Sequence, residues 1–171
     1  MQTKKDPITV DAFHYDRVSP DVEPQQNIQV SLVTISEEDP YLQEADLSAG
    51  NIYQIVTPFQ VAPEKSGFAV SGQISQVVQL LDFFSEPNEI DQKDMIKLSR
   101  PLIEYIETLT YQVTAVALNR GVQLQFTAQA TKTNQRKVAA ILPWPFFSTV
   151  IKNGTGLTFK GLVVQMFVYN G

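Results

Sequence analysis

The order of hydrophobic and polar residues predicts four β-strands followed by one long helix. Apolar and polar residues alternate over 10–16 and 52–61, and a further strand is predicted over 28–35, where five of eight residues are apolar. The fourth stretch, 68–81, is the longest, and one of its faces collects Phe68, Val70, Gly72, Ile74, Val78 and Leu80. Successive side chains of a strand point to opposite faces, so a period of two indicates strands with one buried face.

Three local departures from this pattern predict irregular features within the strands. In the second strand the apolar phase changes at Leu32 and Val33, which indicates a bulge or burial on both faces. Pro58 has no backbone N–H, so the third strand is expected to lie at an edge or to break there. Gly72 in mid-strand is typical of a bulge or a close backbone approach. Joined by short or acidic loops, the four strands are predicted to form an antiparallel meander.

From Asp91 onward the hydrophobic spacing changes to three and four, which predicts a helix of about seven turns. It ends at the stop signal 119–121, Asn-Arg-Gly. Its apolar stripe consists of Met95, Leu98, Leu102, Ile106 with Tyr105, Leu109, Val113 and Val116. Pro101 removes one helical hydrogen bond and is expected to kink or break the helix near Arg100. A helix of this length on one small sheet leaves apolar surface for a partner subunit.

The last 45 residues form a separate region in sequence. A polar, linker-like stretch is followed by apolar runs around Asn153-Gly154, a strong hairpin signal. We therefore divide the chain into a domain at 1–126 and a basic extension with a β-hairpin at 127–171. Three interpretations of the extension remain open: extra strands that cover an edge of the sheet, a swapped or partner-binding hairpin, or a cloning or frame artefact.

Several blocks between residues 8 and 126 recur together in a known family. They are SGQISQV, SEPNEIDQ, LSRPLIEYIETLTYQVTAVAL and QLQF. In this order and spacing they resemble a small uncharacterised family of Gram-positive bacteria that has the fold of SecB, the export chaperone. The resemblance implies an α+β domain, an antiparallel sheet with its helix on one face, built into homo-oligomers, either dimers or tetramers. SecB tetramers hold unfolded preproteins in long apolar grooves, but nothing after residue 126 matches the SecB tail that docks the SecA motor.

Composition excludes several classes of protein. With no cysteine, the chain has no disulfide framework, thiol nucleophile or thiolate metal site. No apolar run approaches the roughly 18 residues of a membrane span, and the N-terminus does not resemble a signal peptide, so we expect a cytoplasmic protein. Residues 1–126 carry a net charge of −10 and residues 127–171 carry +5. An acidic body disfavours nucleic acid, whose phosphates bind Lys and Arg.

Residues for catalysis or metal binding are sparse. His14 is the only histidine, and it lies between two aromatic residues of a predicted strand, where a structural or surface role is expected. The acidic loop at 37–46 lacks the spacing of a calcium loop. Glu104 and Glu107 lie one turn apart but fit a solvated helix face. No phosphate-binding glycine motif is present. We therefore expect no enzyme activity, no cofactor and no metal.

Two sets of residues are candidates for binding. Aromatic residues on successive strands either form the core or line an apolar groove for extended peptide: Phe13, Tyr15, Tyr53, Phe59 and Phe68. Small and polar residues on the other face of 68–81 either face solvent or meet a second sheet in an oligomer: Ala69, Ser71, Gln73 and Ser75. The leading hypothesis is a SecB-like oligomer that binds unfolded or extended polypeptides. The alternative is an interaction or scaffold protein for one folded partner.

Overall fold

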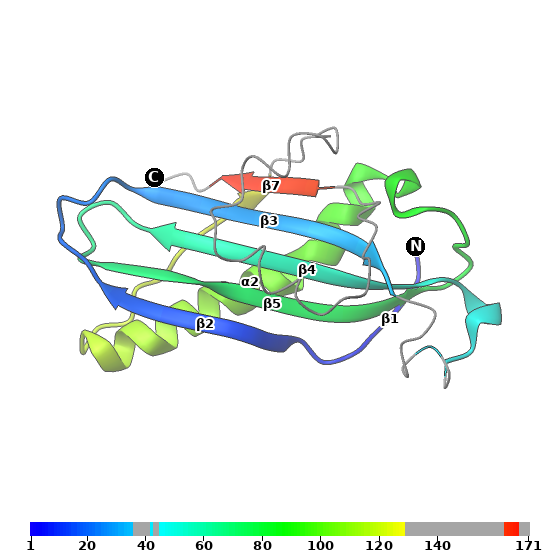
Figure 1. Ribbon diagram of the computed structural model, residues 1–171, viewed down its shortest axis with the longest axis horizontal. Helices are drawn as coiled ribbons and strands as arrows, with labels where there is room; N and C mark the ends of the chain where they lie inside the picture. Colours follow the sequence, from blue (N-terminus) through cyan, green and yellow to red (C-terminus); the bar gives the residue numbers. More distant parts are fainter. Residues whose placement is uncertain (36–41, 43–44, 129–162, 168–171) are drawn as a thin grey trace, which may run out of the picture.

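The computed structural model describes residues 1–35, 42, 45–128 and 163–167. Within these residues, seven strands form one sheet: β1 (Thr3–Lys5), β2 (Thr9–Arg17), β3 (Gln25–Thr34), β4 (Ile52–Ala62), β5 (Phe68–Leu80), β6 (Thr127–Ala128) and β7 (Val163–Phe167). Short 3-10 helices at Leu47–Ala49 and Pro87–Glu89 precede α2 (Gln92–Ala117). Every pairing in the sheet is antiparallel, and α2 crosses one face diagonally (Figure 1). The predicted α+β class is confirmed.

The strand order corrects the predicted meander. β3, β4 and β5 are consecutive neighbours, but β2 pairs with β5 rather than with β3. The result is a Greek-key order, β2-β5-β4-β3. Residues 18–24 connect β2 to β3 across three inter-strand spacings, about 14 Å, and seven extended residues reach about 23 Å. A short connection is thus long enough to pass two strands, and the loop length alone did not exclude this topology.

Pro58 lies in an interior strand, which corrects the prediction of an edge or a break. β4 runs unbroken between β3 and β5, and Pro58 pairs in register with Gln73 of β5. The ladder with β3 skips the proline: Ile28 pairs with Phe59, and the next pair joins Ser31 to Val56. The missing N–H is therefore accommodated by a local gap in the β3–β4 ladder.

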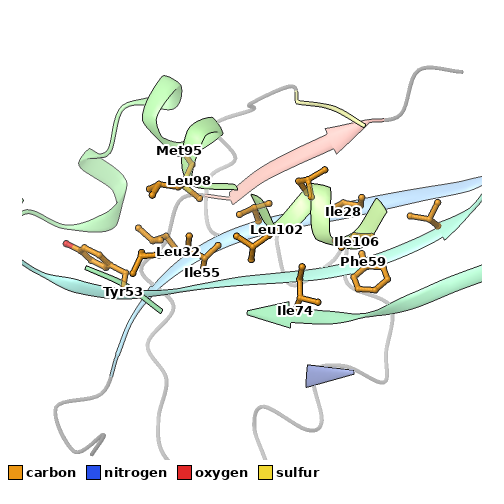
Figure 2. Packing of buried hydrophobic residues seen from close by; sticks show 14 of the residues in the cluster. Ile28, Leu32, Tyr53, Ile55, Phe59, Ile74, Met95, Leu98, Leu102 and Ile106 are labelled. Atoms are coloured by element: carbon orange, nitrogen blue, oxygen red, sulfur yellow. The ribbon is translucent and has the colours of Figure 1, made fainter. Parts of the chain in front are cut away.

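The core lies between the sheet and α2 (Figure 2). The predicted face of β5 is confirmed, since Phe68, Val70, Ile74, Val78 and Leu80 are all fully buried. A Cβ atom at Gly72 would lie 2.1 Å from the carbonyl oxygen of Ala12, so only glycine allows this close approach of β2. The register of β2 also shifts between Val10 and Ala12, next to that contact. Leu32 and Val33 are both buried, so the phase change in β3 reflects burial on two faces.

The buried stripe of α2 differs from the predicted one in its second half. Met95, Leu98, Leu102 and Ile106 are buried as predicted, but the stripe then continues through Thr110 and Thr114. Each threonine hydroxyl donates to the carbonyl oxygen four residues earlier, at 2.8 and 2.7 Å, so its burial leaves no polar hydrogen unpaired. Val116 is instead 82% exposed. The helix continues through Pro101 without a break.

The C-terminal region contributes a strand to the far edge of the sheet. β7 pairs with β3 through residues 28–31, and β6 pairs with β7 (Figure 1). This described part of the extension therefore agrees with the first of the three interpretations, extra strands that cover an edge of the sheet. The predicted hairpin at Asn153-Gly154 lies outside the described residues, as does most of the acidic loop at 37–46.

Candidate interaction surface

Three of the five aromatic candidates belong to the core. Tyr53 is 1% exposed, Phe59 is 3% exposed and Phe68 is fully buried. The hydroxyl of Tyr53 donates to the carbonyl oxygen of Ser85 at 2.5 Å, and burial raises the pKa of this hydroxyl. These three side chains offer no surface to a peptide in this structure. They are therefore core residues and do not line an apolar groove.

Phe13 and Tyr15 lie at the margin of that core. Both are half-buried on β2, where the ring of Phe13 packs 5.9 Å from Phe59 and the ring of Tyr15 stacks 6.0 Å from Phe68. They extend the core toward the edge strand β2, which pairs only with β5 in the part of the chain that the structure describes. His14, between them, is exposed on the opposite face.

The candidate interface residues of β5 all lie on the face that α2 does not cover, as their phase in the strand requires. Ala69, Ser71 and Gln73 are half-buried and Ser75 is 4% exposed. Ser75 and Gln73 both donate to the carboxylate of Asp11 at 3.2 Å. This contact ties the irregular part of β2 to β5. These four β5 residues are thus small or polar, and two of them are hydrogen-bonded within the sheet.

One flank of α2 is bonded to the segment that follows the helix. The hydroxyl oxygen of Thr114 accepts from the backbone N–H of Val122 at 2.8 Å, and the carboxylate of Glu107 accepts from that of Phe126 at 3.0 Å. A Cβ atom at Gly121 would lie 2.3 Å from the ring of Tyr111, so the chain here passes close over that ring. We call Glu107, Tyr111 and Thr114 the bonded flank.

The opposite side of the same helix carries apolar side chains that remain accessible. Tyr105, Leu109 and Val116 fall on one side at 100° per residue, about half a turn from the bonded flank. Tyr105 is 38% exposed and Val116 is 82% exposed, while Leu109 is half-buried against the core. We call these three residues the apolar flank. In Figure 1 the C-terminal turns of α2 emerge beyond β2, at the margin of the sheet. Sequence periodicity had assigned all three residues to the buried stripe.

Charged groups on α2 pair with one another along its exposed surface. Arg100 donates to the carboxylate of Glu104 at 2.7 Å, and this hydrogen bond raises the pKa of Arg100. Lys97 contacts Asp94 at 3.0 Å and lowers the pKa of that carboxyl group. Within the described ranges, no group of three or more His, Cys, Asp or Glu residues could hold a metal ion. No helix of the described part is long and apolar enough to span a membrane.

The fold and this surface define an α+β protein that presents a helix-covered antiparallel sheet and an accessible apolar flank on its helix. The chain belongs to the DUF1149 family of proteins of unknown function, which matches residues 1–126. This confirms the uncharacterised family that the sequence blocks resemble. A comparison with the curated proteins gives no match.

Solved structures include two similar proteins. A protein of unknown function from Streptococcus agalactiae is 28% identical, with a TM-score of 0.62, over 74% of this chain and 98% of its own length. A SecB-like chaperone from Mycobacterium tuberculosis, in complex with a ChAD peptide from an antitoxin, is 8% identical. Its TM-score is 0.46, over 72% of this chain and 86% of that chain.

Proposed function

We propose that the protein is a non-enzymatic, homo-oligomeric protein that binds unfolded or extended polypeptides through the apolar flank of α2. The accessible apolar flank carries the proposal, because Tyr105 and Val116 expose apolar surface along one side of a helix whose opposite side is bonded. Single exposed apolar residues are common, but residues aligned on one helix side can contact a partner together.

The backbone of β2 adds a second element to this surface. β2 is an edge strand in the described part of the sheet, and its outer N–H and C=O groups are positioned to pair with an extended segment. An extended polypeptide can pair with such an edge while it places apolar side chains against a neighbouring helix. This combination suits clients without a fixed fold better than one folded partner.

Aggregation of insulin after reduction of its disulfides tests the proposal. The chain contains no cysteine, so the reductant leaves it unchanged. We expect an equimolar amount of the full-length protein to delay light scattering, and the double variant Tyr105→Gln/Val116→Gln to lose most of that delay. A matched control, Lys93→Gln/Thr108→Gln, changes two exposed polar positions of the same helix and is expected to act like the wild type.

The outcomes separate the possible occupants of the flank. A wild-type protein that leaves insulin aggregation unchanged would refute polypeptide binding. A double variant as active as the control would place the binding site elsewhere. Native mass spectrometry completes the test. If the double variant is a smaller oligomer than the control while its delay is unchanged, the flank is a contact between copies of this chain instead.

A further inference from the structure

The edge of β3 is built to receive a strand, and the chain supplies one from its own far end. Ile28 and Val30 of β3 are almost fully buried core residues. β7 pairs with this edge through Ile28↔Met166, Gln29↔Gln165, Val30↔Val164 and Ser31↔Val163. Without β7, the outer backbone groups of a core strand would lack these strand partners.

This position is also where β3 has the least support from its inner neighbour. The ladder between β3 and β4 runs from Ile28–Phe59 directly to Ser31–Val56, because Pro58 has no N–H to donate. The pairs with β7 span that same gap. Among the described residues, the register pairs of Gln29 and Val30 are therefore those with β7, so an outer strand has a larger role here than elsewhere along β3.

The occupant is attached by a long connection and lies outside the family region. The family match ends at residue 126, and the Streptococcus agalactiae protein covers 98% of its own length with 74% of this chain. The region that matches the family thus ends before β6, and β7 lies after it. Residues 129–162 separate β6 from β7 in the sequence, and because both strands belong to one chain, the pairing of β7 with β3 is an intramolecular event.

We propose that the β3 edge, residues 28–31, is a strand-acceptor site and that β7 is its tethered, exchangeable occupant. The partner that fits is an extended, uncharged and mostly apolar segment, like the sequence 162–169, LVVQMFVY. In a second copy of the protein the same segment replaces β7 in trans, so that two chains exchange strands. The intact chain keeps its own acceptor site closed. This proposal does not depend on polypeptide binding at the apolar flank.

Cysteine pairing tests the acceptor site in the full-length, naturally cysteine-free chain. Gln29 and Gln165 are Cα partners, and opposed antiparallel Cα atoms lie about 4.5–5.5 Å apart, within the range of a disulfide. We expect oxidised Gln29→Cys/Gln165→Cys to form a cross-link within one chain at micromolar concentration, and an increasing share of covalent dimer toward millimolar concentration. Gln54→Cys/Gln165→Cys, one strand further in, is the matched control and should not cross-link.

Absence of any cross-link above the control would overturn the acceptor site. A cross-link that stays within one chain at every concentration would overturn exchange.

Binding of a peptide in trans tests closure by β7. The probe is a fluorescein-labelled peptide of residues 160–170. We expect Gln165→Pro, which removes a strand N–H, to bind the peptide at least about tenfold more tightly than the wild type, because the acceptor site is no longer occupied. Gln165→Thr keeps the N–H and should bind like the wild type.

Equal affinities of the three proteins would overturn the proposal. If Gln165→Pro fails to fold, the Gln29→Cys/Gln165→Cys protein replaces it: the peptide should bind only after reduction, and binding to the oxidised form would contradict the assignment.

Discussion

The two flanks of α2 differ in whether the segment after the helix is hydrogen-bonded to them, although both flanks belong to the same turns of the helix. On the bonded flank, Thr114 and Glu107 each accept a backbone N–H from the returning segment, and Gly121 passes over the ring of Tyr111. On the apolar flank, Tyr105 and Val116 have accessible surface and contribute no hydrogen bond to that return.

The difference shows which flank serves the fold and which is available for binding. A hydrogen bond lost on the bonded flank leaves a backbone donor without its partner, which costs free energy of unfolding. An exposed apolar side chain contributes little to the stability of the folded state, because folding removes little of its surface from water. Variants of the bonded flank should therefore lower stability, and variants of the exposed residues of the apolar flank, Tyr105 and Val116, should mainly change binding.

The largest effect is expected at Thr114. Thr114→Val keeps the shape of the side chain but removes the oxygen that accepts from Val122, so a part-buried N–H loses its partner. We expect the free energy of unfolding to fall by about 1–2 kcal/mol, measured by urea denaturation. Thr108→Val is the control, because that hydroxyl is exposed and bonds only within the helix. Equal losses for both variants would contradict the role of the bonded flank.

A smaller loss is expected at Gly121. In Gly121→Ala the new Cβ would lie 2.3 Å from the Tyr111 ring, which must move away. Because this ring is 50% exposed, it can rotate into solvent, and we expect a loss of about 1 kcal/mol in thermal denaturation. A double-mutant cycle with Tyr111→Ala checks the cause. The loss should disappear in the Tyr111→Ala background, and a loss that persists there would rule out the ring contact.

The contrast between the flanks could be predicted from sequence only in part. The spacing of Met95, Leu98, Leu102 and Ile106 correctly predicts one buried stripe. Beyond Ile106 the apolar residues keep the direction of Leu98 and Leu102, while the buried positions drift around the helix to two threonines. Hydroxyls that bond within the helix can be buried at little cost, but in sequence they resemble a solvated face. Periodicity therefore assigned the apolar flank to the core.

The sequence predicts which face of a strand is buried, but it does not predict the order of the strands in the sheet. Alternation in β5 identifies the face that α2 covers, and Gly72 correctly indicates a close backbone approach. Which strand approaches depends on long-range pairing, and no local pattern specified that β2 returns to β5. The same limit applies to the aromatic residues. The alternation of Tyr53 and Phe59 gives their face, but whether a helix covers it is decided by tertiary packing.

The negative charge of Glu107 on the bonded flank is expected to contribute less to the free energy of unfolding than the features at Thr114 and Gly121. Glu107→Gln keeps an oxygen that can accept from Phe126 and removes only the charge, so we expect a loss of about 0.5 kcal/mol in urea denaturation. Glu104→Gln, which disrupts an exposed pair with Arg100, is the control and should change stability by less than that. A larger loss at Glu104 than at Glu107 would show that the helix surface charges, rather than the return segment, account for the effect.

The smallest change in stability is expected on the apolar flank, where the largest change in binding is expected. Val116 is 82% exposed, so Val116→Ser removes little buried surface and should alter the free energy of unfolding by less than about 0.5 kcal/mol. The same variant should weaken the delay of insulin aggregation, because a partner on this flank would bury the valine. Measuring urea denaturation and light scattering on one preparation compares the two effects directly. A variant that loses stability as strongly as Thr114→Val would mean that Val116 serves the fold, and the two flanks would then not differ in the way proposed.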